Sequence, residues 1–158
     1  MAFATEPVLT GVKGAPAAEL FLGAKSCPGR WANTHVNTYS TNWNEGLNLL
    51  VTSSGFRIFD PGLYTISWKV RFNDTLVPPN LGNQAWIELY GQTIRYGLGA
   101  TDQNSSNDPL RASEARGAIS LSISASTLFE LWVCNGHNSS RTTLANGGTW
   151  LTIMKHPS

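Results

Sequence analysis

The chain has 158 residues, only 13% of them charged, and a formal net charge of +1 at pH 7. Because soluble domains usually have about 25% charged residues, this surface depends on neutral polar groups and lacks the positive field that nucleic acids or anionic membranes require. The length fits a single domain with a sizeable core, and no run of about 18 apolar residues predicts a membrane-spanning helix.

The N-terminal segment contains the breakers Gly11, Gly14 and Pro16, which favour an extended arm. Its first residues, MAFATEPVLTG, have neither the basic n-region nor the apolar h-region of a signal peptide. We therefore expect an arm over residues 1–18, a β-domain over residues 19–158, and synthesis in the cytoplasm without a signal peptide.

Short stretches of alternating apolar and polar residues follow, separated by turn residues, and none has the length and period of a helix. Strands are predicted at Glu19–Gly23, Leu47–Thr52, Gly55–Phe59, Gln84–Tyr90, Gln92–Gly97, Ala118–Ser124, Thr127–Cys134 and Thr149–Lys155. Tyr90-Gly91-Gln92 predicts a tight reversal, and a short turn at Ala125-Ser126 predicts a hairpin between its two flanking strands. With the strand described next, this pattern predicts an all-β, two-sheet antiparallel sandwich of jelly-roll type.

The longest strand pattern is FDPGLYTISWKVRF, from Phe59 to Phe72. Asp60-Pro61-Gly62 is typical turn chemistry. Beyond this corner the residues on one face are Tyr64, Ile66, Trp68, Val70 and Phe72, and those on the other are Thr65, Ser67, Lys69 and Arg71. Since alternate side chains of a strand point to opposite sides, one face of this strand is wholly apolar.

Three long loops could carry function: Asn73–Asn83, Gly99–Ala112 and Asn135–Gly148. Trp31 and Trp43 lie in less regular segments among asparagines, and an exposed indole beside polar groups can stack on a sugar. Packing inside the protein is the alternative role for these two side chains. The candidate ligand surface consists of Trp31, Trp43, Trp86, His137 and Arg141.

Catalytic and metal-binding motifs are not found. His35, His137 and His156 have no partner at a metal-ligand spacing, and no nucleophile elbow, phosphate loop or HExxH motif occurs. We therefore expect no enzymatic activity, cofactor or metal. Cys27 and Cys134 allow either two thiols or a disulfide, and the sequence leaves both open.

The stretch SSGFRIFDPGLYTISWKVRF resembles the central signature of the globular heads of the complement-component and tumour-necrosis-factor superfamily. QAWIELYGQTIRYG, SEARGAISLSISASTLFELWV and GGTWLTIMK resemble later strands of that family, so the resemblance covers Leu47 to Lys155. It implies a ten-stranded jelly roll that assembles as a homotrimer, with one sheet turned toward the threefold axis. It also implies that five large residues are divided between the core and the trimer interface: Tyr64, Trp68, Phe72, Trp150 and Met154.

Cytokine or complement activity is not expected, since no collagen-like stalk precedes the domain and the family's cysteine and calcium positions have no clear counterpart. Bacterial viruses use similar trimeric jelly rolls as capsid decorations, head fibres or receptor-binding modules. We therefore expect a non-enzymatic structural and adhesive trimer on the virion surface of a bacteriophage. Its expected partners are a capsid or tail protein bound by the arm and a host-surface glycan, with no nucleic acid and no membrane insertion. The alternative is a bacterial carbohydrate-binding lectin module with sites between subunits.

Overall fold

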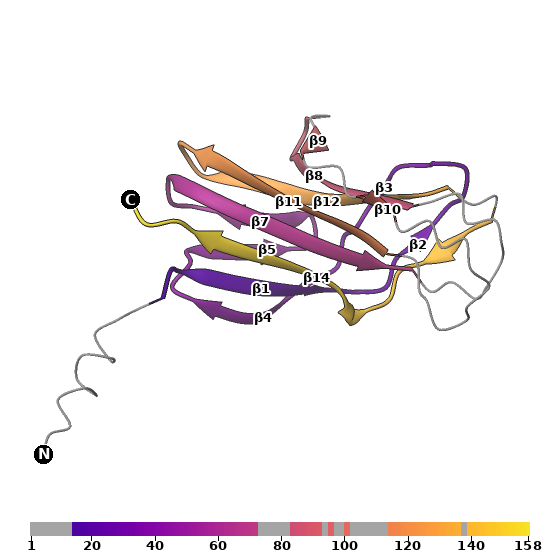
Figure 1. The fold of residues 1–158 in the computed structure, drawn as a ribbon, viewed down its shortest axis with the longest axis horizontal. Helices are drawn as coiled ribbons and strands as arrows, with labels where there is room; N and C mark the ends of the chain where they lie inside the picture. Colours follow the sequence, from indigo (N-terminus) through magenta and orange to yellow (C-terminus); the bar gives the residue numbers. More distant parts are fainter. Residues whose placement is uncertain (1–13, 73–82, 93–94, 97–99, 102–113, 137–138) are drawn as a thin grey trace, which may run out of the picture.

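The computed structural model describes residues 14–72, 83–92, 95–96, 100–101, 114–136 and 139–158. These residues form an all-β sandwich of antiparallel strands (Figure 1). None of the described segments is a helix that could cross a membrane. The predicted all-β, two-sheet antiparallel architecture is confirmed.

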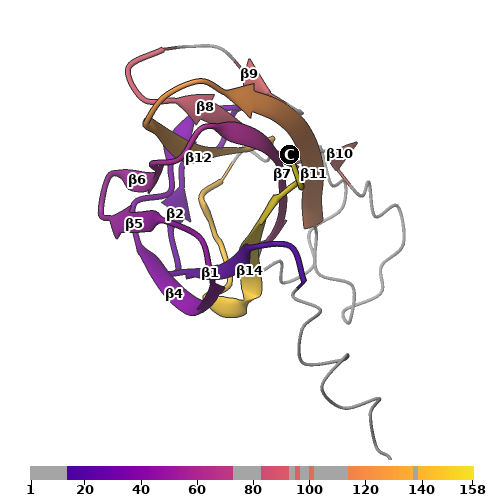
Figure 2. The same ribbon diagram turned by 90° about the vertical axis from the view of Figure 1, so that its left-hand side faces the viewer.

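Two sheets face each other across the core, as the end-on view in Figure 2 shows. The first sheet has the order β10 (Ala100–Thr101), β11 (Glu114–Ile123), β7 (Gly62–Arg71), β14 (Asn146–Lys155), β1 (Ala17–Leu22) and β4 (Tyr39–Glu45). The second sheet has the order β5 (Leu49–Thr52), β6 (Gly55–Ile58), β12 (Thr127–Asn135), β8 (Asn83–Leu89) and β9 (Arg95–Tyr96), and β3 (Thr34–His35) pairs with β12. A small third sheet joins β13 (Arg141–Thr142) to β2 (Ser26–Cys27).

Strand β7 crosses the middle of the first sheet, and its apolar face supplies much of the core. Tyr64, Trp68 and Phe72 are buried, so the structure assigns these three residues to the core. The Trp68 indole donates a hydrogen bond to the Ala85 carbonyl of the second sheet at 3.2 Å, and the Tyr64 hydroxyl donates to the Asp60 carbonyl at 2.8 Å. The corner at Asp60 is therefore tied to the strand that it precedes.

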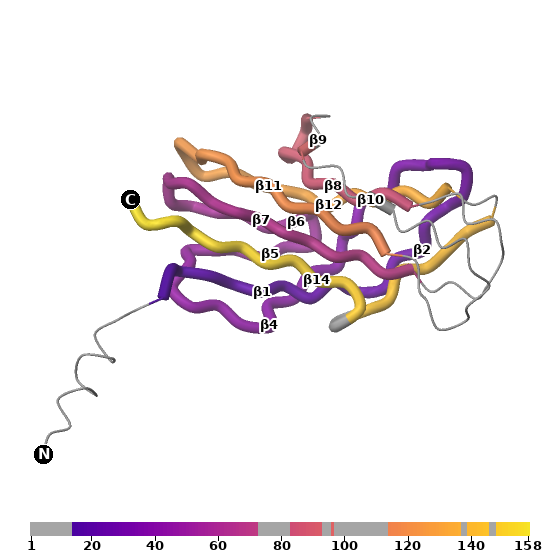
Figure 3. Tube along the Cα trace, in the orientation of Figure 1, coloured from indigo at the N-terminus to yellow at the C-terminus, as the bar shows by residue number. Residues whose placement is uncertain are grey.

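The two ends of the domain meet in the first sheet. Strand β1 lies beside β14 in the trace of Figure 3, with Leu20 opposite Leu151 in the register. Strand β1 begins at Ala17, and Ala18 is fully buried in the core, so the first strand starts inside the segment that the sequence assigned to the arm. Residues 1–13 lie outside the described residues.

The predicted hairpin between Ala118–Ser124 and Thr127–Cys134 is wrong. Strand β11 pairs with β7, whereas β12 pairs with β6 and β8, so the short turn carries the chain from one sheet to the other. Alternation and turn residues are the same for a hairpin and for such a crossing. Only distant strand partners decide between them.

Strand β4 was not predicted. Its sequence, YSTNWNE, has no apolar alternation because it is an edge strand whose residues after Tyr39 are all exposed.

The predicted turn at Tyr90-Gly91-Gln92 is confirmed, since Gln92 N donates to Leu89 O at 3.0 Å and β8 pairs with β9.

Candidate subunit interface

The outward face of the first sheet carries more apolar surface than an isolated domain requires. Leu63 on β7 is 45% exposed, Met154 on β14 is 41% exposed and Trp43 on β4 is 39% exposed. Phe21 and Trp150 are half-buried and belong to the same outward rows of their strands. We call this set (Phe21, Trp43, Leu63, Trp150 and Met154) the outer apolar band.

Strand register brings members of the band together. Phe21 lies directly opposite Trp150, and Met154 lies opposite Ala17, which adds a small apolar side chain. Directly opposed side chains on one face of a sheet are close enough to pack against each other. The band therefore forms a surface that follows β1 and β14.

Hydroxyl groups fill the neighbouring rows of this face. Thr65 Oγ1 shares hydrogen bonds with Ser120 Oγ at 2.7 Å and with His156 Nε2 at 2.6 Å, and Ser67 Oγ bonds Thr152 Oγ1. A polar group that is already hydrogen-bonded costs less to remove from water than an unpaired one. This region can therefore be covered by another protein surface at a small desolvation cost.

A charge cluster occupies the part of the face formed by β7 and β11. The Glu114 carboxylate contacts Arg116 Nη2 at 2.7 Å, Arg71 Nε at 3.2 Å and Lys69 Nζ at 3.5 Å. Burial alone would raise the pKa of Glu114, but the hydrogen bond from Arg116 and the charges of Lys69 and Arg71 outweigh it and hold that pKa below its ordinary value. Three cations around one carboxylate give this cluster of four residues a net charge of +2.

The opposite edge of the sheet has the opposite charge. Glu19 on β1 and Glu45 on β4 lie in the outward rows, next to Trp43 and Ala17 in the register. Among the described residues, the β7–β11 side of the face is thus positive and the β1–β4 side is negative. This pattern suits a head-to-tail contact between copies of the chain, in which different edges of one face meet, and such contacts close into rings when the rotation permits.

The structure shows which of the five large residues predicted for the core or the trimer interface face the core and which face outward. Tyr64, Trp68 and Phe72 face the core, while Trp150 and Met154 face outward in the apolar band. Sequence reasoning missed Phe21 and Leu63. Each is an apolar residue in the outward phase of its strand, and that signal was present in the alternation pattern.

The described members of the candidate ligand surface are not brought together by this fold. Trp31 is 45% exposed just after β2, with a positive φ of 62°, and Trp43 lies on β4 in the first sheet. Trp86 is fully buried, so the expectation that its indole stacks on a sugar at the surface is wrong. Arg141 is only 7% exposed, which corrects its placement on an open loop, and His137 lies outside the described residues.

The likeness of this chain to known proteins lies in its structure. No protein-family model and no curated protein matches the sequence. Among solved structures, Eiger TNF from S. frugiperda has a TM-score of 0.63 at 13% identity, over 92% of this chain and 95% of that chain. Murine APRIL has a TM-score of 0.60 at 13% identity, over 90% and 100% of the two chains.

A third similar structure is the PRD1 vertex protein P5, with a TM-score of 0.57 at 19% identity, over 92% of this chain and 100% of that chain. All three likenesses extend along almost the full length of both chains. The chain therefore has the tumour-necrosis-factor-like jelly-roll fold that its sequence resembles.

Proposed function

We propose that the chain is a non-enzymatic subunit of a homotrimeric structural module on a virus particle, assembled through the outward face of the first sheet. The outer apolar band, with residues of opposite charge on its two sides, supports this assembly. A monomer would leave Leu63, Met154 and Trp43 in water, whereas a second copy of the chain offers both the apolar surface and the complementary charge.

The similar structures support the same assignment. The tumour-necrosis-factor-like proteins among them are trimers, and the P5 protein is a vertex protein of phage PRD1. These proteins are cytokines or a phage structural protein, which supports a non-enzymatic role. Within such a particle we assign the chain to capsid decoration, a head fibre or receptor binding, with the part of the arm that precedes β1 as the attachment to a capsid or tail protein.

The mass of the native protein in solution, measured by light scattering, tests the assembly. We expect a trimer for the natural chain and a folded monomer for Met154→Asp, because a carboxylate in the apolar band would be buried without a partner. Leu50→Asp is the matched control, since Leu50 is 48% exposed on β5 of the second sheet and should leave the trimer intact. A monomeric natural chain, or a Met154→Asp variant that remains trimeric, would contradict the proposed interface.

Deletion of residues 1–13 tests the role of the arm separately. We expect the shortened chain to remain trimeric, because β1 begins at Ala17, but to lose its attachment to virus particles in a co-sedimentation assay. Unchanged attachment would rule out the arm as the docking segment.

A further inference from the structure

A pocket of about 280 Å³ lies on the second sheet, on the side of the sandwich opposite the candidate interface. Its lining residues are Asn33, Glu88, Gly91, Gln92, Glu130 and Trp132. Its volume is close to the lower limit of known ligand sites, about 300 Å³, so it suits a ligand the size of one ring. All the lining residues belong to a single chain, so the pocket does not depend on the proposed trimer.

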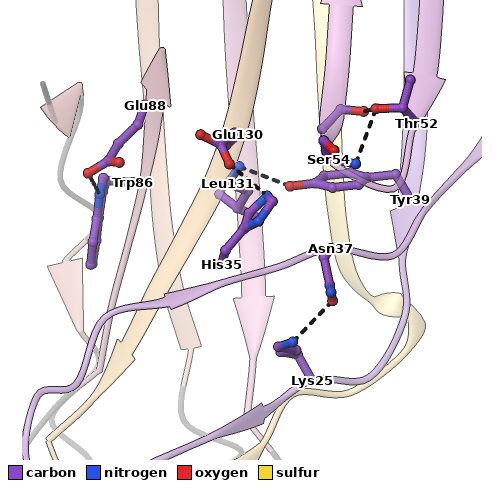
Figure 4. A network of polar contacts seen from close by, with 11 residues as sticks. Lys25, His35, Asn37, Tyr39, Thr52, Ser54, Trp86, Glu88, Glu130 and Leu131 are labelled. Carbon is purple, nitrogen blue, oxygen red and sulfur yellow. Dashed lines mark hydrogen bonds and ion pairs between the residues drawn. The ribbon is translucent and has the colours of Figure 1, made fainter. Parts of the chain in front are cut away.

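Two carboxylates face each other in this pocket. Glu130 on β12 lies directly opposite Glu88 on β8, and the two residues are 7% and 6% exposed. The Trp86 indole donates to Glu88 Oε1 at 2.9 Å, and His35 Nε2 contacts Glu130 Oε2 at 3.1 Å (Figure 4). Among the side chains that the structure describes, neither carboxylate has an ion pair with Lys or Arg.

This arrangement costs stability. Like charges placed directly opposite each other in an antiparallel pair are destabilising. Burial, followed by the charge of Glu88, raises the pKa of Glu130. Positions that break the rules of stable packing in this way are found preferentially at binding or catalytic sites. A ligand that donates hydrogen bonds to these oxygens would compensate part of the cost.

The other lining residues define the chemistry of that ligand. Trp132 is half-buried, with the His35 ring stacked on it at 5.3 Å and 25°, so its orientation is supported from one side. Asn33 and Gln92 are exposed amides beside the carboxylates. Carboxylates accept hydrogen bonds, amides both accept and donate, and an indole face contacts C–H groups. A sugar ring carries both the hydroxyls and the C–H faces that this set requires.

We propose that this pocket binds one neutral sugar residue of a glycan. Glu88 and Glu130 accept hydrogen bonds from adjacent hydroxyls, Trp132 contacts a C–H face, and Asn33 and Gln92 complete the polar contacts at the rim. The paired carboxylates exclude sialic and uronic acids by charge repulsion. A neutral ligand is favoured because the indole face and the two amides of the lining suit C–H groups and hydroxyls.

The site differs from the ligand surface that the sequence indicated, since it uses Trp132 in place of Trp31, Trp43 or Trp86 and lies within one subunit. In a trimer it would occur three times on outward surfaces, so weak single contacts would combine into avidity for a dense glycan.

Saturation-transfer NMR on the full chain tests the proposal. The probes are the methyl glycosides of glucose, galactose, mannose and N-acetylglucosamine at about 10 mM, because isolated sugar contacts have millimolar affinity. Sialic acid and methylguanidinium serve as charged comparisons. We expect at least one neutral sugar to bind and both charged probes to give no signal.

Substitutions in the pocket then test whether the sugar binds there. Glu88→Gln keeps the side-chain shape and an acceptor for Trp86, and it removes one of two like charges, so it should fold normally. Circular dichroism checks this. We expect Glu88→Gln and Trp132→Leu each to weaken sugar binding about tenfold, the loss of one charge-assisted contact or of the stacking surface. Trp31→Leu is the matched control and should bind as the natural chain does, because Trp31 is exposed and lies outside both the pocket and the outer apolar band.

Three outcomes would overturn the assignment. One is that no neutral sugar binds, and another is that sugars bind but the pocket variants behave as the natural chain while Trp31→Leu does not. The third is binding of methylguanidinium without any sugar, which would make the pocket a receptor for a cationic side chain. A monomeric chain that still binds sugar would refute only the proposed trimer, so the two proposals fail separately.

Discussion

The backbone of Gly55 at the start of β6 passes so close to β12 that a Cβ atom at position 55 would lie 2.0 Å from the Phe129 carbonyl oxygen. Gly55 also has a φ of +148°, a conformation that residues with a side chain rarely adopt. The pairing of β6 with β12 therefore depends on the absence of a side chain at this position.

Gly55→Ala should lower the free energy of unfolding by roughly 2 to 4 kcal/mol, since strained backbone and a forced displacement of Phe129 both contribute. Gly91→Ala is the matched control, because Gly91 also has a positive φ of 76° but a Cβ there would meet nothing within 4 Å. It should lose only about 1 kcal/mol. Urea denaturation of both variants measures the difference, and equal losses would show that the contact with Phe129 is unimportant.

Glu130→Gln should raise the melting temperature by about 2 °C, because it removes one of two facing buried charges. The contact with His35 need not be an ion pair, because burial and then Lys25 lower the pKa of His35, so Gln can replace the carboxylate beside this imidazole. Asp60→Asn is an exposed control that keeps the acceptor for the Asn48 amide, and it should have little effect. A lower melting temperature for Glu130→Gln would mean that the Glu130 carboxylate stabilises the folded chain.

The pH dependence of Glu130 follows from the same contacts. Its folded pKa is raised above the ordinary value of 4.5, so its ionised form costs stability at higher pH. As pH falls through the folded pKa toward 4.5, the natural chain should gain stability relative to Glu130→Gln. Melting curves of the two proteins, recorded from neutral to acidic pH, should show the difference between their melting temperatures becoming smaller as pH falls.

Glu114 should show the opposite behaviour. Its folded pKa is lowered, because the contacts with Arg116, Lys69 and Arg71 outweigh burial, so its stabilising contribution is present above the ordinary value of 4.5 and disappears as pH falls through the lowered pKa. Glu114→Gln should therefore lose about 1 kcal/mol at neutral pH, and this difference should vanish in strong acid. Urea denaturation at the two pH values checks this; a difference that is independent of pH would assign the loss to packing.

The two cysteines should resist thiol reagents in the folded protein. Both are buried, no disulfide joins them, and burial raises the pKa of Cys27 to about 12. Because the thiolate is the reactive form, an aromatic disulfide reagent at mildly alkaline pH should react slowly with the native chain and quickly with two thiols in urea. Finding no thiols in urea would mean that the two cysteines are joined by a disulfide.

The sequence determined much of the fold, because alternation is a local property. The apolar face of β7, the reversal at Tyr90-Gly91-Gln92 and the sandwich class all follow from residues within a few positions of each other. Strand β4 shows the limit of this reasoning. An edge strand with one residue packed on the core carries no alternating signal, so YSTNWNE could not be recognised.

Alternation shows that a strand has two different faces. Only the tertiary structure decided what each of those faces contacts. The crossing between β11 and β12, the position of Trp150 and Met154 outside the core, and the burial of Trp86 all depend on partners distant in the sequence. The same applies to Glu88 and Glu130, which are separated along the chain and meet only through the register of β8 and β12. Local patterns fix the two faces of a strand, but long-range pairing fixes what those faces contact.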